Sequence, residues 1–161
     1  MSTTATTVKA MGFSELKTWL RHRHPMIYLD RVLDHEPGVS LTSMLSVSGN
    51  MDSVAGHFPE RAIFPASHLT QAMAQSAIIL LQVSTTLLAD DEITLVGSLK
   101  ARFTKIVVPG DQVVISTRFD EETSGNTFSY TCRATVGPAP VAACQLTLVR
   151  LNVEQLGEQF W

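Results

Sequence analysis

Residues 66–88 form the longest helical candidate in the chain, and this segment limits the fold more than any other feature of the sequence. Apolar side chains occur on most of its faces, so the helix is expected to be buried nearly all round. Ala72, Ala74 and Ala77 keep it thin enough for close packing on several sides. The apolar run over residues 77–81 is too short to cross a bilayer, which takes about 20 residues. We therefore expect a helix inside a protein core.

Strand-like segments surround this helix in the sequence. A short helix is expected over residues 13–20, where apolar residues follow helical spacing. The expected strands cover residues 26–35, 40–47, 92–105, 112–119, 127–136 and 141–152. Because strands and helices do not alternate, the one long helix must bury its faces in a sheet that curls around it. The sequence therefore predicts an α+β fold, with an antiparallel sheet wrapped around one long central helix.

Length and composition fit a single domain. The chain has 161 residues, 45% hydrophobic and 17% charged, which is enough for a core and argues against disorder. We expect a loose arm over residues 1–11 and one domain over residues 12–161. The net charge of −3 gives no reason to expect nucleic acid or a membrane as partner. Cys132 and Cys144 lie in strand-like runs and are expected to be reduced. The N-terminal residues do not resemble a signal peptide. Together with reduced cysteines, this predicts a cytoplasmic location.

A histidine loop precedes the long helix, and polar residues continue along one helix face. His57 lies in this loop, which ends at Pro65, a residue suited to a helix start. Gln71 and Gln75 are four residues apart and therefore share a face. The polar residues one turn earlier are Ser67 and His68. A histidine against a polar stripe on an otherwise buried helix predicts an active site.

Four segments resemble the FabZ-type 3-hydroxyacyl-[acyl-carrier-protein] dehydratases, which have the hotdog fold. They are residues 22–32 (HRHPMIYLDRV), 56–59 with 64–65 (GHFP and FP), 72–75 (AMAQ), and 101–103 with 107–112 (ARF and VVPGDQ). They occur in the family's order and spacing, and the similarity extends over about residues 13–149. The resemblance implies a hotdog fold for the predicted sheet and helix.

The resemblance also implies a reaction, the loss of water from a 3-hydroxyacyl thioester on the phosphopantetheine arm of an acyl carrier protein. In such a site His57 takes the α-proton, and the backbone N–H of Ala66 binds the thioester carbonyl. Position 71 of the other subunit protonates the departing β-hydroxyl. Gln75 and Gly97 are expected to bind substrate in a tunnel between the long helix and the strand over residues 92–105. Neither a resident cofactor nor a metal is expected.

Gln71 departs from the family pattern, which has Glu at this position. An amide has no proton to give at an accessible pH, so Gln71 has lost the general-acid role while keeping a similar shape. Ala66 stands where the family usually has Gly. Ser67 and His68 replace apolar residues. They are candidates for a nucleophile, a substitute proton donor and substrate contacts, or for polar filling near a dimer seam.

Three functions stay open at this point. The first is a dehydratase (a lyase) of fatty-acid-like or polyketide biosynthesis, in which a homologous partner supplies the acid or Gln71 and water act weakly in its place. The second is a hotdog acyl-thioesterase, which is disfavoured because a glutamine can only position water. The third is a non-catalytic acyl-binding or scaffolding subunit.

The expected partners are an acyl carrier protein and a second subunit. The second subunit would form a homodimer, a heterodimer with a FabZ-like homologue, or a higher oligomer. A basic set, Lys100, Arg102 and Lys105, would either attract an acidic carrier protein or form a solvated strand face.

Overall fold

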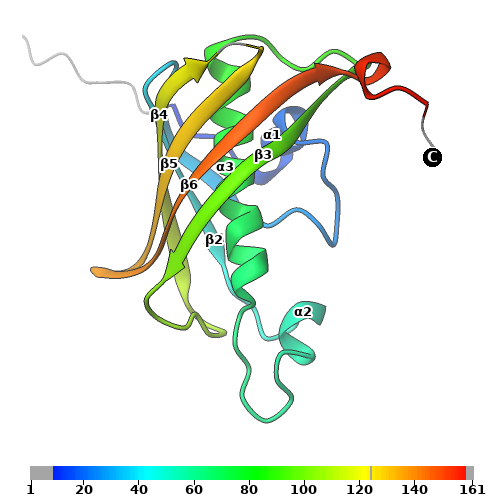
Figure 1. Ribbon diagram of the computed structural model, residues 1–161. Coiled ribbons are helices and arrows are strands. Elements are labelled where there is room, and N and C mark those ends of the chain that lie inside the picture. The colour runs from blue at the N-terminus through cyan, green and yellow to red at the C-terminus, as the bar shows by residue number, and fades with distance from the viewer. Residues whose placement is uncertain (1–8, 124, 159–161) are drawn as a thin grey trace, which may run out of the picture.

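The computed structural model describes residues 9–123 and 125–158. Its elements are α1 (Phe13–Trp19), β1 (Arg31–Glu36), β2 (Ser40–Ser46), α2 (Asp52–Ala55), α3 (Ala66–Ser84), β3 (Glu92–Phe103), β4 (Gln112–Thr123), β5 (Thr127–Val136), β6 (Ala139–Asn152) and the 3-10 helix η1 (Val153–Leu156) (Figure 1). The predicted short helix, long helix and strands are all present, although several of them begin or end elsewhere.

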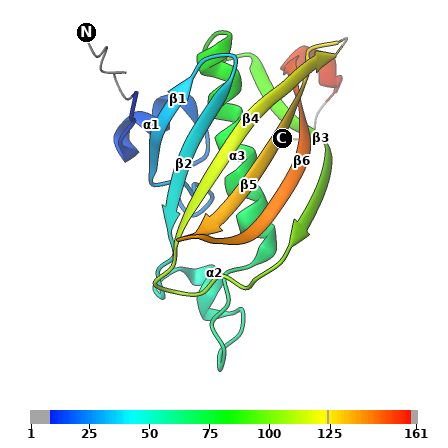
Figure 2. The ribbon, with the colours of Figure 1, turned by 90° about the vertical axis from the view of Figure 1, so that its left-hand side faces the viewer.

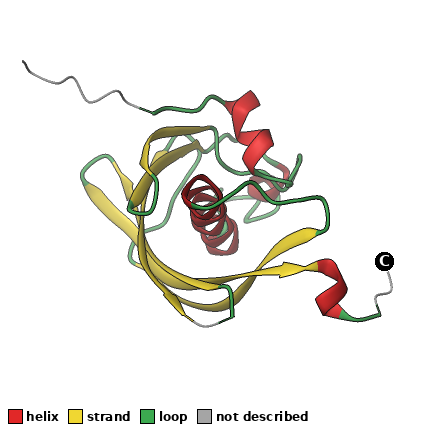
Figure 3. Ribbon diagram, turned by 90° about the horizontal axis from the view of Figure 1, so that it is seen from above, coloured by secondary structure: helices red, strands yellow, loops and turns green. Residues whose placement is uncertain are grey.

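The strands form a six-stranded sheet in the order β1-β2-β4-β5-β6-β3. Every neighbouring pair is antiparallel. Seen from above, the sheet curves around α3, which lies in its concave side (Figure 3). This arrangement confirms the predicted α+β hotdog fold.

Helix α3 forms the centre of the core. Its buried residues are Leu69, Ala72, Met73, Ala74, Gln75, Ser76, Ala77, Ile78, Ile79, Leu80, Leu81 and Gln82. The polar Ser76 is satisfied inside the core, because its hydroxyl lies 2.9 Å from Ser43 Oγ and 2.9 Å from Thr117 Oγ1. These bonds fix the rotation of α3 against β2 and β4, and so fix which of its residues face away from the sheet.

The strand predicted over residues 26–35 is shorter than expected. Strand β1 begins only at Arg31. Upstream of it, the backbone N–H of Tyr28 donates to Gln75 Oε1 at 3.0 Å. The extended segment before β1 is therefore held by a side chain of α3 rather than by a neighbouring strand.

Two helix predictions also need correction. Helix α3 ends at Ser84 instead of about residue 88, since the next four residues are held by side chains: Arg150 Nη1 donates to Thr86 O at 2.9 Å, and Leu88 N donates to Gln82 Oε1 at 3.0 Å. The segment expected to be a loop over residues 49–56 contains the short helix α2, which buries Val54.

Strand β3 forms one edge of the sheet and β1 the other (Figure 2). In the described chain β3 pairs only with β6. Its exposed apolar residues are Leu95, Val96, Leu99 and Phe103. Exposed apolar side chains on a twelve-residue edge strand offer a surface on which another chain can pair.

An ion pair closes the end of this edge. Glu92 Oε1 accepts from Arg150 Nε at 2.9 Å, and the pair joins the start of β3 to β6. The hydrogen bond from Arg150, aided by one from the backbone of Ala89, lowers the pKa of Glu92 from 4.5 to about 2.

The ion pair predicts a pH-dependent stability. The folded pKa of Glu92 lies below its unfolded value, so the stabilisation is complete above about pH 4.5 and is lost as the pH falls towards about 2. We expect Glu92→Gln to be less stable than the wild type at neutral pH, with the difference disappearing near pH 2. Urea unfolding of the wild type and of Glu92→Gln, from neutral pH down to about pH 2, measures this difference in the free energy of unfolding. A difference that stays constant with pH would contradict the assignment.

The N-terminal arm predicted over residues 1–11 lies mostly outside the described residues. Of its described part, Met11 is buried and pairs with Val32, accepting and donating backbone hydrogen bonds of 3.0 and 2.9 Å. Among the residues that the structure describes, no helix has the length and hydropathy needed to cross a membrane.

Candidate active site

His57 lies in the loop between α2 and α3. This loop extends below the start of the long helix (Figure 1). Its Nδ1 lies 3.0 Å from the carbonyl oxygen of Ile63. A carbonyl can only accept a hydrogen bond, so Nδ1 carries the ring proton and Nε2 of the neutral ring keeps its lone pair. The loop is closed by a second bond, from Ile63 N to His57 O at 2.8 Å. The sequence of this loop therefore presents an oriented imidazole whose Nε2 has no hydrogen bond to the residues that the structure describes.

A cavity of about 320 Å³ opens beside this ring. Its walls come from the loop, from the first turn of α3 and from the segment after β3: His57, Ile63, Phe64, Ala66, Leu69 and residues 103–107. Ala66 is the first residue of α3, so its N–H has no acceptor within the helix and lies at the positive end of the helix dipole. The cavity thus combines a base, an N–H donor and mostly apolar walls.

Ser67 and His68 flank this first turn. Ser67 Oγ lies 3.3 Å from His68 Nδ1. The His68 ring packs edge-on against Tyr28, with ring centroids 4.9 Å apart. Burial, and then the nearby His57, lower the pKa of His68, which favours a neutral ring. A neutral ring is a poor proton donor, so the packing role fits His68 better than the role of a substitute acid.

Gln71 does not line the cavity beside His57 in the described chain. Its amide Nε2 instead lies 3.1 Å from Nε2 of His22, in the segment after α1. Within the described chain the predicted base and the predicted acid position therefore do not line the same cavity.

Gln75, one turn further along α3, is fully buried and has both ends of its amide occupied. Oε1 accepts from Tyr28 N at 3.0 Å, and Nε2 donates to Met26 O at 2.6 Å. Its role as a substrate contact stays a prediction, while its role in holding the segment before β1 is visible.

Gln75→Leu is expected to lower the free energy of unfolding by about 2–4 kcal/mol. It leaves the N–H of Tyr28 and the carbonyl of Met26 without their hydrogen-bond partner, and each such loss costs about 1–3 kcal/mol. Gln71→Leu is the matched control. Gln71 is only half-buried and bonds no backbone group of residues 9–123 or 125–158, so we expect Gln71→Leu to lower the free energy of unfolding by less than about 1 kcal/mol. Urea unfolding measures both. Equal losses would contradict the anchoring role of Gln75.

Gly97 lies at an irregularity in the pairing of β3 with β6. A Cβ at this position would come within 3.0 Å of Thr147 Oγ1 and 3.1 Å of Val149 Cγ2. This close approach accounts for a glycine on the strand. Its part in substrate binding stays a prediction.

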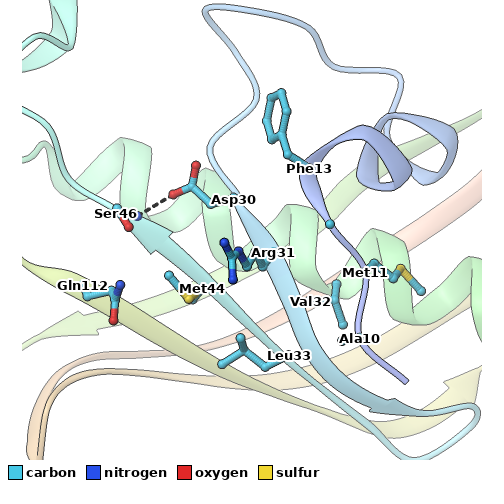
Figure 4. A pocket seen from close by; sticks show the side chains of 11 residues that line it. Ala10, Met11, Phe13, Asp30, Arg31, Val32, Leu33, Met44, Ser46 and Gln112 are labelled. Atoms are coloured by element: carbon cyan, nitrogen blue, oxygen red, sulfur yellow. Dashed lines mark hydrogen bonds between the residues drawn. The ribbon is translucent and has the colours of Figure 1, made fainter. Parts of the chain in front are cut away.

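A larger hollow of about 890 Å³ lies elsewhere, between the chain before α1 and strands β1, β2 and β4 (Figure 4). It contains none of the predicted site residues. Asp30 at its rim accepts from the backbone N–H of Ser46 at 2.6 Å, which ties the start of β1 to the end of β2. This contact supports a structural role for Asp30.

One contact of a predicted site residue could not be predicted. The contact of Gln71 with His22 joins residues 49 positions apart, and no local pattern gives such a contact. The cavity wall over residues 103–107 overlaps the end of the strand over residues 92–105, which the sequence predicts to line the substrate tunnel.

A family model described as a FabA-like domain matches residues 20–145, which include His57, Ala66 and Gln71. The chain is 58% identical over 153 residues to a coronafacic acid dehydratase of Pseudomonas savastanoi pv. glycinea, covering 95% of this chain and 92% of that protein. It is 41% identical over 121 residues to the 3-hydroxyacyl-[acyl-carrier-protein] dehydratase FabZ of Colwellia psychrerythraea, covering 74% of this chain and 81% of that protein.

Among solved structures, the dehydratase heterocomplex ApeI:P from Xenorhabdus doucetiae matches with a TM-score of 0.71 and 15% sequence identity, covering 89% of this chain and 97% of that chain. At this identity the match supports the fold, while the sequence relatives and the matched domain support the family. The chain belongs to the family of FabA-like domains, as a FabZ-type protein with the hotdog fold.

Proposed function

We propose that this chain is a dehydratase-class protein that removes water from a 3-hydroxyacyl thioester in fatty-acid-like or polyketide biosynthesis. The observation that carries the proposal is the His57 ring, whose Nδ1 is held by Ile63 O so that Nε2 is free to act as a base. The names of the relatives, a coronafacic acid dehydratase and a FabZ dehydratase, point to the same reaction.

The reaction would begin at the α-carbon. His57 Nε2 takes the α-proton, and the electron pair of the broken C–H bond moves towards the thioester carbonyl, whose oxygen accepts from the Ala66 N–H. The electron pair then forms the double bond as the bond between the β-carbon and the hydroxyl breaks. The hydroxyl takes a proton and leaves as water, and the product is the enoyl thioester.

The source of that last proton depends on the partner. Gln71 can hold the hydroxyl but cannot protonate it. In a homodimer, His57 returns the proton that it has taken. In a heterodimer, a homologue with a carboxylic acid at the corresponding position supplies it directly. Because the second route has a dedicated acid, it is expected to be faster.

A second subunit would complete the site at the β3 edge. The wall over residues 103–107 begins at Phe103, the last residue of β3, so the His57 cavity lies beside the exposed apolar side chains of this edge. A partner strand on that edge would cover Leu99 and Phe103 and bring a second α3 near the cavity. The solved ApeI:P structure, one chain of which matches this fold, is a dehydratase heterocomplex, and this supports a partner subunit for the present chain.

An acyl carrier protein would deliver the substrate. Lys100, Arg102 and Lys105 are exposed on and just after β3, and Lys105 reaches the rim of the His57 cavity. Such a set attracts an acidic carrier and speeds its encounter. The buried cysteines, Cys132 and Cys144, are free, in keeping with a cytoplasmic location.

The test is to offer a 3-hydroxyacyl pantetheine thioester to the purified chain, alone and with a FabZ-like homologue from the same genome. Enoyl product and free thiol are followed in the same sample. We expect enoyl product without thiol release, and more of it when the homologue is present. Thiol release without enoyl product would contradict the proposal and indicate a thioesterase.

A further inference from the structure

His22 lies in the segment between α1 and β1 and is half-buried against α3. Its Nε2 is 3.1 Å from Gln71 Nε2. An amide nitrogen has two hydrogens and no lone pair to offer, so the amide donates and the imidazole accepts. This contact therefore requires a neutral His22 ring with its proton on Nδ1.

The surroundings of His22 favour a neutral ring. Burial, and then the neighbouring Arg23, lower the pKa of His22 and keep it neutral. Nδ1 is buried and, among the residues that the structure describes, has no hydrogen-bond partner. A protonated ring would place a charge in this site without a carboxylate to balance it.

The two glutamines on this face of α3 differ in what they leave free. Both ends of the Gln75 amide bond to backbone groups. Gln71 has only its Nε2 occupied, and within the described chain no protein group donates to its Oε1. Because the amide is planar, fixing Nε2 on His22 also fixes the direction of Oε1.

We propose that His22 is a positioning residue for Gln71, holding the amide so that Oε1 is presented as an acceptor for the β-hydroxyl of the substrate in the partner's site. The inference rests on the function proposed above. The hydroxyl then lies in a defined direction relative to the partner's base, which is what a glutamine can contribute in place of an acid. Without His22 the amide would rotate and offer donor and acceptor alternately.

The first measurement needs no substrate. In protein labelled with ¹⁵N-histidine, long-range ¹H–¹⁵N correlations report which ring nitrogen carries the proton, with the His22 signals assigned by their absence in His22→Gln. We expect the proton on Nδ1 in the wild type, and a mixture of the two tautomers in Gln71→Leu. A proton on Nε2 in the wild type would overturn the proposal.

The second measurement is a double-mutant cycle. His22→Phe removes the acceptor at similar size, and His22→Gln places an amide oxygen near the position of Nε2. We expect His22→Phe to lower kcat by about tenfold with little change in KM, the effect of about one hydrogen bond. We expect His22→Gln to recover most of it, and His22→Phe to have no further effect in a Gln71→Leu background. His24→Phe, two residues away and exposed, is the matched control.

If His22→Phe lowered kcat by the same factor in the wild-type and in the Gln71→Leu background, His22 would have a general structural role, and the proposal would be overturned. If His22→Phe does not fold, His22→Gln and the tautomer measurement still decide. If the wild type shows no dehydration, the proposed function fails, while the tautomer measurement separately decides whether His22 holds Gln71.

Discussion

His57→Ala is expected to lower the rate of dehydration by about 10²–10⁴-fold, the range that a positioned general base contributes. The loss should appear mainly in kcat, because the ring acts on the α-proton rather than on the binding of the thioester. The fold should be retained, since the only side-chain hydrogen bond of this ring in the described chain is the one to the Ile63 carbonyl.

The rate of enoyl formation from a 3-hydroxyacyl pantetheine measures this effect, and His24→Ala is the control histidine in an exposed position. A His57→Ala protein that is correctly folded and keeps more than about a third of the wild-type rate would contradict the role of His57.

Gln71→Glu is expected to act in the opposite direction and raise the rate of dehydration by up to about 10²-fold, the lower end of what a general acid contributes. The two side chains are nearly the same size, so the carboxyl group can occupy the place of the amide. It adds the proton that the amide lacks. Gln71→Leu, with neither proton nor acceptor, should lower the rate below that of the wild type.

The rates of enoyl formation by purified Gln71→Glu and Gln71→Leu, compared with the wild type, test both expectations. No gain for a folded Gln71→Glu protein would mean that position 71 does not face the β-hydroxyl. Because Gln71 is half-buried and bonds only His22 within the described chain, a loss of folding is not expected to hide the result.

The fold could be predicted from the sequence because few folds can bury a single long helix that is apolar on most of its faces. The apolar faces of residues 66–84 have no helical partner long enough to cover them, so the strands must do so, and the six-stranded antiparallel sheet follows. Element ends were less predictable because tertiary contacts set them. Arg150, 64 positions from Thr86, holds the chain after α3, and Gln75 holds Tyr28 ahead of β1.

The candidate site was predictable in part. The resemblance selected His57 and Ala66, and these two residues line one cavity. Sequence reasoning placed Gln71 on the helix but could not give its neighbour, because His22 reaches it across the fold. It also grouped Gln75 with the substrate contacts, whereas in the structure both ends of that amide are bonded to backbone.

The central claim is that His57 of one subunit works with position 71 of another. It is tested most directly by one mixed dimer. The double variant His57→Ala/Gln71→Glu lacks the base and should be inactive alone. Co-expressed with the wild-type chain and purified through two different tags, it would form dimers in which the wild-type His57 faces the new glutamate.

We predict that this mixed dimer dehydrates a 3-hydroxyacyl pantetheine faster than the wild-type protein, although the added subunit is itself inactive. A mixed dimer no faster than the wild type, measured where the Gln71→Glu single variant does show its gain, would contradict a site shared between subunits.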